Sequence, residues 1–131
     1  MHATGPFDVK MAPQPLAQAD STRARFSLDK HYHGALEATA MGEMLSGGDP
    51  RAGEAGYVAL ETVTGTLDGR PGTFQLMHWG RMHAGSFELR VEVVPGSATG
   101  DLKGLSGSLQ IKAEGGKHSY VFDYSLPEGS V

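Results

Sequence analysis

Residues 57–78 read YVALETVTGTLDGRPGTFQLMH, two alternating segments separated by a short break. Side chains alternate in character from Tyr57 to Leu67, and a period of two is typical of a β-strand. The residues DGRP at 68–71 interrupt the alternation, which then resumes as far as His78. This pattern predicts a β-hairpin.

The position of the turn decides which residues face each other across this hairpin. A loop over residues 68–71, or over the two residues at its centre, pairs Glu61 with His78. A turn centred on Asp68-Gly69 instead pairs His78 with Ala59 and leaves His78 diagonal to Glu61. Directly opposite residues of an antiparallel pair share a face. In both registers the acid and the imidazole therefore lie on the apolar face of the hairpin, which is marked by Val63, Leu67, Phe74 and Leu76.

Two interpretations of Glu61 and His78 remain open at this point. In the first, both side chains face solvent, or they hydrogen-bond to each other and have a structural role only. Alternatively, they could form a polar site on an apolar wall, where burial shifts both pKa values and mutual attraction opposes those shifts. In that case the pair could move a proton on a bound substrate or polarise its oxygen.

Composition excludes several classes of function. The chain has 131 residues and a net charge of -4 without any run of Lys or Arg, which argues against nucleic-acid and anionic-membrane partners. It has no cysteine, hence no disulfide framework and no Cys-ligated zinc. The first twenty residues lack the apolar core of a secretory signal, so we expect a cytoplasmic protein. The length predicts one domain over residues 1–131.

The rest of the chain alternates in the same way, and no window shows a convincing helical stripe. Further strands are predicted over Thr4–Met11, on both sides of a bend near His33-Gly34 in the segment that starts at Arg23, and over residues 87–93, 107–112 and 118–126. The segment 46–56, SGGDPRAGEAG, is predicted to be the longest loop. A turn at Gly115-Gly116 pairs Ile111 with Tyr120, Leu109 with Phe122 and Gly107 with Tyr124.

These elements predict an all-β fold, a single closed antiparallel barrel of about eight strands. Closure removes the exposed edges that an open sheet of this size would have to protect. A barrel of this size either fills with side chains or holds one small ligand. Small inward residues such as Gly34, Ala38, Ala40 and Gly65 favour a cavity.

Four separated motifs resemble one known family: KHYHGALEATAMGEML, YVALETVTGTLDGRPGTFQLMH, VVPGSATGDLKGLSGSL and HSYVFDYSL. In order and spacing they are similar to a bacterial domain-of-unknown-function family of small barrels that resemble allene oxide cyclase, within the dirigent-like and calycin-like barrels. The resemblance covers Phe7 to Leu126. It implies the barrel fold and a Glu and a His at positions 61 and 78. It also implies a cyclase-like activity that folds an apolar substrate in a shaped cavity.

The predicted function is binding of a largely apolar small molecule in the lumen, without a cofactor. In its sharper form the protein is an isomerase or cyclase in which Glu61 and His78 are catalytic. The alternative is a non-catalytic ligand-binding or structural barrel, and a homo-oligomer formed through an outer face is expected. The predicted ligand-binding residues share the inward phase: Tyr57, Phe74, Leu76, Phe87, Leu89, Tyr120, Phe122 and Tyr124.

A rival hypothesis is a metal site at His31, His33 and Glu37. The spacing His-x-His-x-x-x-Glu is that of the metal ligands of cupins, and imidazoles two apart on a strand point the same way. However, no second cupin motif follows, and the three residues share the phase of Arg25 and Asp29, which is expected to face water. No metal ligand is therefore predicted.

Overall fold

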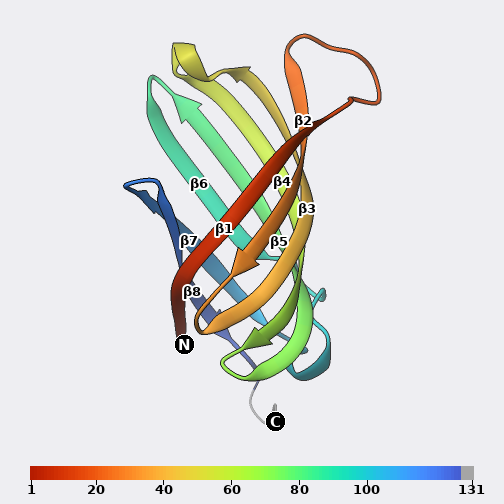
Figure 1. Ribbon diagram of the computed structural model, residues 1–131, viewed down its shortest axis with the longest axis vertical. Helices are drawn as coiled ribbons and strands as arrows, with labels where there is room; N and C mark the ends of the chain where they lie inside the picture. The colour runs from red at the N-terminus through yellow and green to blue at the C-terminus, as the bar shows by residue number, and fades with distance from the viewer. Residues whose placement is uncertain (128–131) are drawn as a thin grey trace.

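The computed structural model is a closed barrel of eight antiparallel strands, and it describes residues 1–127 (Figure 1). Each strand pairs with the next along the chain, and β1 pairs with β8 to close the ring. The elements are β1 (His2–Gln14), β2 (Arg23–Tyr32), β3 (Leu36–Asp49), η1 (Pro50–Ala52), β4 (Glu54–Leu67), β5 (Arg70–His83), β6 (Ser86–Val93), η2 (Gly100–Leu102), β7 (Ser106–Glu114) and β8 (Lys117–Ser125). The predicted all-β barrel is confirmed.

Alternation along each strand decides which side chains enter the lumen. On β4, Glu61 and Val63 are buried whereas Val58 and Leu60 are exposed. The predicted bend between β2 and β3 is confirmed, because β2 ends at Tyr32 and β3 begins at Leu36. The pairing predicted for β7 and β8 is also confirmed, including Leu109 with Phe122.

The central hairpin adopts the second of the two predicted registers. Ala59 pairs with His78 and Glu61 pairs with Leu76, so a loop over 68–71 or over its two central residues is wrong. The turn residues are Asp68 and Gly69, with φ of 49° and 82°. Two residues in the left-handed region give the turn whose twist matches that of paired strands.

The predicted long loop at 46–56 is wrong. The hairpin of β3 and β4 continues through most of it, with Gly47 paired with Gly56 and Asp49 paired with Glu54. Only the single turn of η1 separates the two strands. The loop was predicted from the glycine content of this segment. Glycine keeps its backbone N–H and C=O groups, however, so paired glycines continue the hydrogen bonds between the two strands.

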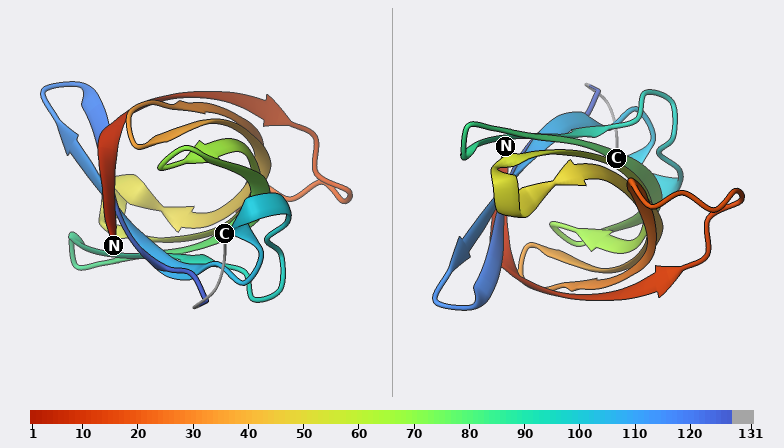
Figure 2. Two further views of the ribbon diagram at one scale, coloured as in Figure 1. Left: turned by 90° about the horizontal axis from the view of Figure 1, so that it is seen from below. Right: turned by 90° about the horizontal axis from the view of Figure 1, so that it is seen from above.

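The two ends of the barrel differ in what covers them (Figures 1 and 2). The N-terminus, the end of β8 and the β2–β3 and β4–β5 turns lie at one end, which we call the terminal end. The half of the lumen at this end is filled by core side chains, among which Phe74 stacks on Phe122 with ring centroids 5.8 Å apart. At the opposite end lie η1 and the loop between β1 and β2. We call this end the mouth.

One seam of the barrel is less extensively paired than the others. Between β6 and β7, only Glu92 and Ser108 are paired. All other neighbouring strands are paired over continuous stretches, as for β4 and β5. In residues 1–127, no helix has both the length and the apolar character needed to cross a membrane.

The β4–β5 turn gives a first prediction. Gly69→Ala should lower the free energy of unfolding by about 1 kcal/mol, because a Cβ is disfavoured at a left-handed φ. A Cβ at this position would meet no atom within 4 Å, so the loss would come from the backbone alone. Urea denaturation measures it. Gly69→Asn is the matched control and should lose less, and equal losses in the two variants would contradict the backbone explanation.

Candidate functional site

A pocket of about 450 Å³ opens into the lumen from the mouth. Inward side chains of six strands, β1 to β6, form much of its wall: Met11, Phe26, Met44, Tyr57, Met82 and Phe87. We call this the mouth pocket. Its lining is largely apolar, since Arg23 is the only charged residue in it, and ligand pockets in proteins commonly have this size and character.

The predicted ligand-binding residues divide between this pocket and the packed core. Tyr57 and Phe87 line the mouth pocket. Leu89 is half-buried and packs against the core. The remaining five are buried in the core, at the filled part of the lumen: Phe74, Leu76, Tyr120, Phe122 and Tyr124. The lumen is therefore open only in the half nearer the mouth.

Four polar side chains meet inside the barrel, and Glu61 is at their centre. Lys30 Nζ and His78 Nε2 each lie 2.7 Å from Glu61 Oε2, and the Tyr32 hydroxyl donates to Oε1. Adjacent inward positions of β2 supply Lys30 and Tyr32, while β4 and β5 supply the other two. We call these four residues the buried cluster. Lys30 is 5% exposed, Glu61 1% and His78 6%, so the charges have almost no contact with water.

The buried cluster holds Glu61 as a carboxylate. Burial by itself raises the pKa of this carboxyl. The hydrogen bond from His78 and the positive charge of Lys30 outweigh burial and lower the pKa from its ordinary 4.5 to about 2. Glu61 therefore accepts hydrogen bonds from three donors and is a poor base at neutral pH.

Two tyrosines next to this carboxylate stay protonated. Burial, and then the negative charge of Glu61, raise the pKa of Tyr32. The same two causes raise the pKa of Tyr57 to about 12. Tyr32 uses its hydroxyl on Glu61, whereas the Tyr57 hydroxyl has no hydrogen-bond partner within residues 1–127. Tyr57 can therefore donate a hydrogen bond to a molecule in the mouth pocket.

Tyr57 connects the mouth pocket to the buried cluster. It lines the pocket, and its ring centroid lies 6.4 Å from that of His78. Nδ1 of His78 has no hydrogen-bond partner among the described residues. Every fully buried side-chain nitrogen or oxygen in these residues does have a partner, so Nδ1 is not fully buried. Nδ1 therefore keeps contact with solvent-accessible space. It is the one ring nitrogen of His78 that Glu61 does not engage.

Gly80 makes room for the Tyr57 ring across the β4–β5 ladder. The two residues are paired, and a Cβ at position 80 would lie 2.1 Å from Cε1 of Tyr57. The ring therefore occupies the space that a side chain at position 80 would need. This close approach fixes the tyrosine at the boundary between pocket and cluster.

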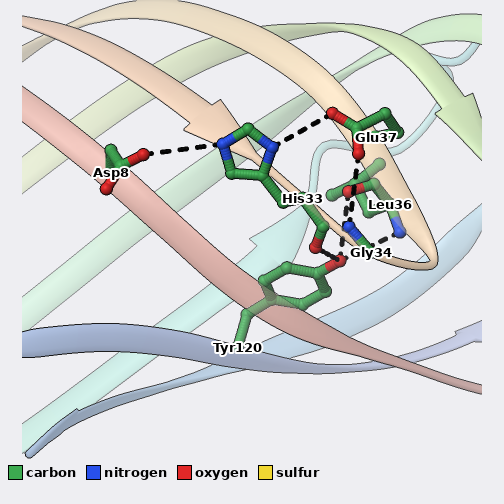
Figure 3. Close-up of polar contacts among 6 residues, drawn as sticks. All are labelled: Asp8, His33, Gly34, Leu36, Glu37 and Tyr120. Atoms are coloured by element: carbon green, nitrogen blue, oxygen red, sulfur yellow. Dashed lines mark hydrogen bonds and ion pairs between the residues drawn. The ribbon is translucent and has the colours of Figure 1, made fainter.

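The rival metal hypothesis finds no support in the geometry. No group of three or more His, Asp or Glu side chains in residues 1–127 is placed to hold a metal ion. Instead, His33 Nδ1 lies 3.2 Å from Glu37 Oε2 and its Nε2 lies 3.5 Å from Asp8 Oδ2 (Figure 3). In the same turn the Tyr120 hydroxyl accepts from the Leu36 N–H at 2.9 Å. These contacts tie the β2–β3 turn to β1 and β8.

Sequence reasoning brought Glu61 and His78 to one face but missed Lys30 and Tyr32 as their partners. Lys30 falls between Leu28 and Tyr32 in the inward phase of β2. A lysine in the apolar phase of a strand needs a buried counter-charge. That signal, applied to Lys30, would have pointed to Glu61. The apolar lining from Met11, Phe26, Met44 and Met82 was missed as well.

Comparison with known proteins identifies the family. A family model described as "Protein of unknown function (DUF3224)" matches residues 3–124. The chain belongs to the DUF3224 family. It is similar to a DUF3224 protein of unknown function from Shewanella oneidensis MR-1, whose crystal structure matches with a TM-score of 0.92, 42% identity and 98% of each chain covered. No curated protein of known function matches the chain. Family membership therefore supports the fold and assigns no activity.

The low pKa of Glu61 predicts a pH-dependent stability. An unfolded chain binds a proton at about pH 4.5 and the folded one only at about pH 2, so this contribution is complete above pH 4.5 and is lost as the pH falls through 2. The expected loss is on the order of 3 kcal/mol. It is measured as the free energy of unfolding in urea between pH 6 and pH 2.

The matched control is the double variant Lys30→Met with Glu61→Gln, which leaves no unpaired charge in the lumen. Asp20 and Glu54, whose pKa values are also lowered, are intact in both proteins. The difference between the two pH profiles therefore isolates the buried cluster. Parallel profiles would contradict a depressed Glu61 pKa.

Proposed function

We propose that this protein binds one largely apolar small molecule in the mouth pocket, with a polar group of the ligand near Tyr57 and His78. The observation that supports this proposal is an apolar pocket adjacent to a buried, charged cluster. The pocket provides the surface that an apolar molecule requires. The free hydroxyl of Tyr57 and Nδ1 of His78 provide hydrogen-bonding groups that orient a ligand and confer specificity.

The buried cluster itself argues for a functional role. Replacing a buried ion pair with apolar side chains of similar volume is often neutral or stabilising. The half of the lumen at the terminal end is packed with such side chains, for example Phe74 and Phe122. A lysine, a glutamate and a histidine at this depth therefore are not needed for packing. Their position next to Tyr57, which lines the pocket, favours recognition or chemistry.

The methionines in the pocket wall indicate tolerance of ligand shape. Met11, Met44 and Met82 all line the pocket. Methionine is unbranched and polarisable, and it adapts to irregular apolar surfaces. We expect affinity for a class of apolar molecules with one hydrogen-bonding group. The cytoplasmic location predicted from the sequence remains part of this proposal.

Binding can be tested with the neutral fluorescent probe N-phenyl-1-naphthylamine. Its fluorescence should rise saturably on addition of the wild-type protein, at one probe per chain. Met44→Glu should weaken binding by at least about tenfold, because it places a charge in the apolar wall. Fluorescence titration gives the dissociation constant.

Met41→Glu is the matched control, since it is the same substitution on the same strand. Met41 points outward and is 73% exposed, so probe affinity should stay within about twofold of wild type. Absence of saturable binding, or equal affinity in the two variants, would overturn the mouth pocket as the binding site.

A second candidate function is isomerisation or cyclisation of the bound molecule, as the resemblance to allene oxide cyclases implies. The hydrogen bond between His78 and Glu61 favours it, because a carboxylate that fixes an imidazole is a recurrent catalytic arrangement. In this case Nδ1 of His78 would exchange the proton. Glu61 would orient and stabilise the imidazole, since its own pKa of about 2 makes it a poor base.

Turnover of a panel of apolar epoxides and unsaturated ketones tests this second function. His78→Gln should lower the rate by at least about 100-fold while probe affinity stays within a few-fold. Glu61→Gln should also lower the rate. Tyr124→Phe, which removes a hydroxyl bound to Asp68 in the packed half, is the control and should not change the rate. No turnover across the panel, or an unchanged rate in His78→Gln, would remove the catalytic candidate and leave ligand binding intact.

A further inference from the structure

Most of the large apolar side chains exposed in residues 1–127 lie on one outer face of the barrel. They are Met41, Leu45, Val58, Leu60, Met77 and Trp79, which are 40–73% exposed. All six belong to three neighbouring strands, β3, β4 and β5. We call them the outer patch. A contiguous apolar patch of this kind marks an interaction surface.

The register of the strands arranges this face in rows that run across the barrel. In the first row Leu45, Val58 and Trp79 lie side by side on β3, β4 and β5. Arg25 on β2 continues this row at one side and Arg90 on β6 continues it at the other. The row is therefore apolar in the middle with an arginine at each end.

The neighbouring row has the opposite charges at its ends. Leu60 and Met77 lie side by side on β4 and β5. Glu43 on β3 lies on one side of them and Glu92 on β6 on the other. The outer face thus carries an arginine row and a glutamate row next to each other.

We propose that the outer patch is the interface of a homodimer. Consider a two-fold axis that lies in the plane of the patch, runs across the strands and passes between the two rows. This axis places the arginine row of one copy over the glutamate row of the other. Arg90 then faces Glu92 of the second copy, and the reverse contact forms by symmetry.

The apolar centre satisfies the same symmetry. Val58 meets Leu60 of the second copy, and Trp79 meets Met77. By contrast, an axis parallel to the strands would place arginine over arginine and glutamate over glutamate, which is unfavourable. Sheets that pack face to face are rotated by about 30°, and Arg and Glu side chains are long enough to span the resulting offset.

Self-complementarity selects a second copy as the occupant of this face. Arg25 already pairs with Glu43 of the same chain, so the charge match between copies depends on Arg90 and Glu92, which a two-fold dimer brings face to face. The mouth pocket is lined by inward side chains and lies at the end of the barrel, so dimerisation leaves it open. This inference is therefore independent of the proposed ligand binding.

Charge reversal on β6 provides the test, with mass measured by light scattering during size-exclusion chromatography. Wild type should show twice the 13.8 kDa of one chain. Arg90→Glu places glutamates at positions 90 and 92, and Glu92→Arg places arginines at both. Each variant alone should dissociate to monomers. An equimolar mixture should recover the dimer mass, because each residue of one variant then faces its opposite charge on the other.

Circular dichroism verifies that both variants are folded, which is expected since both positions are exposed. Lys112→Glu, on the exposed surface of β7, is the charge-reversal control and should remain a dimer. The proposal is overturned if wild type is a monomer at millimolar concentration, or if each variant alone stays dimeric. A mixture that remains monomeric would overturn the proposed axis.

Discussion

Compensation of one buried negative charge shapes the interior of this barrel. A carboxylate removed from water costs several kcal/mol unless donors surround it. Glu61 receives hydrogen bonds from Lys30, Tyr32 and His78, which come from β2 and β5 on the two sides of β4 and β3. The register of four adjacent strands must hold for these atoms to meet. The polar centre thus specifies the arrangement of the wall, while the apolar core supplies most of the stability.

This arrangement divides the lumen into zones with different roles. Aromatic and aliphatic side chains fill the terminal end, and the buried cluster separates them from the mouth pocket. In the cluster, three donors from two strands hold the Glu61 carboxylate in place. The pocket is adaptable because methionines form much of its wall. The proposed binding site therefore combines a specific polar contact with an adaptable apolar surface.

The fold was largely predictable because alternation is local. Closure into a barrel was predicted because an open sheet of this size would leave exposed edges, while the strands and the pairing of Leu109 with Phe122 followed from period and turn position. The register of the central hairpin did not, since it depends on Asp68 adopting a left-handed φ that many sequences would avoid. The site was half predictable. Glu61 and His78 could be placed on one face from the hairpin, whereas Lys30 is 31 residues away from Glu61 and becomes its partner only when β2, β3 and β4 assemble.

The seam between β6 and β7 is held by fewer backbone hydrogen bonds than the rest of the barrel wall. Since only Glu92 and Ser108 are paired there, the hairpin of β7 and β8 can swing outward while few hydrogen bonds break, and Figure 1 shows its tip diverging from β6. Phe87 and Leu89 lie on the β6 side of this seam. The least hydrogen-bonded part of the barrel wall thus lies beside two inward side chains of β6, and separation of β6 from β7 there would widen the lumen next to them.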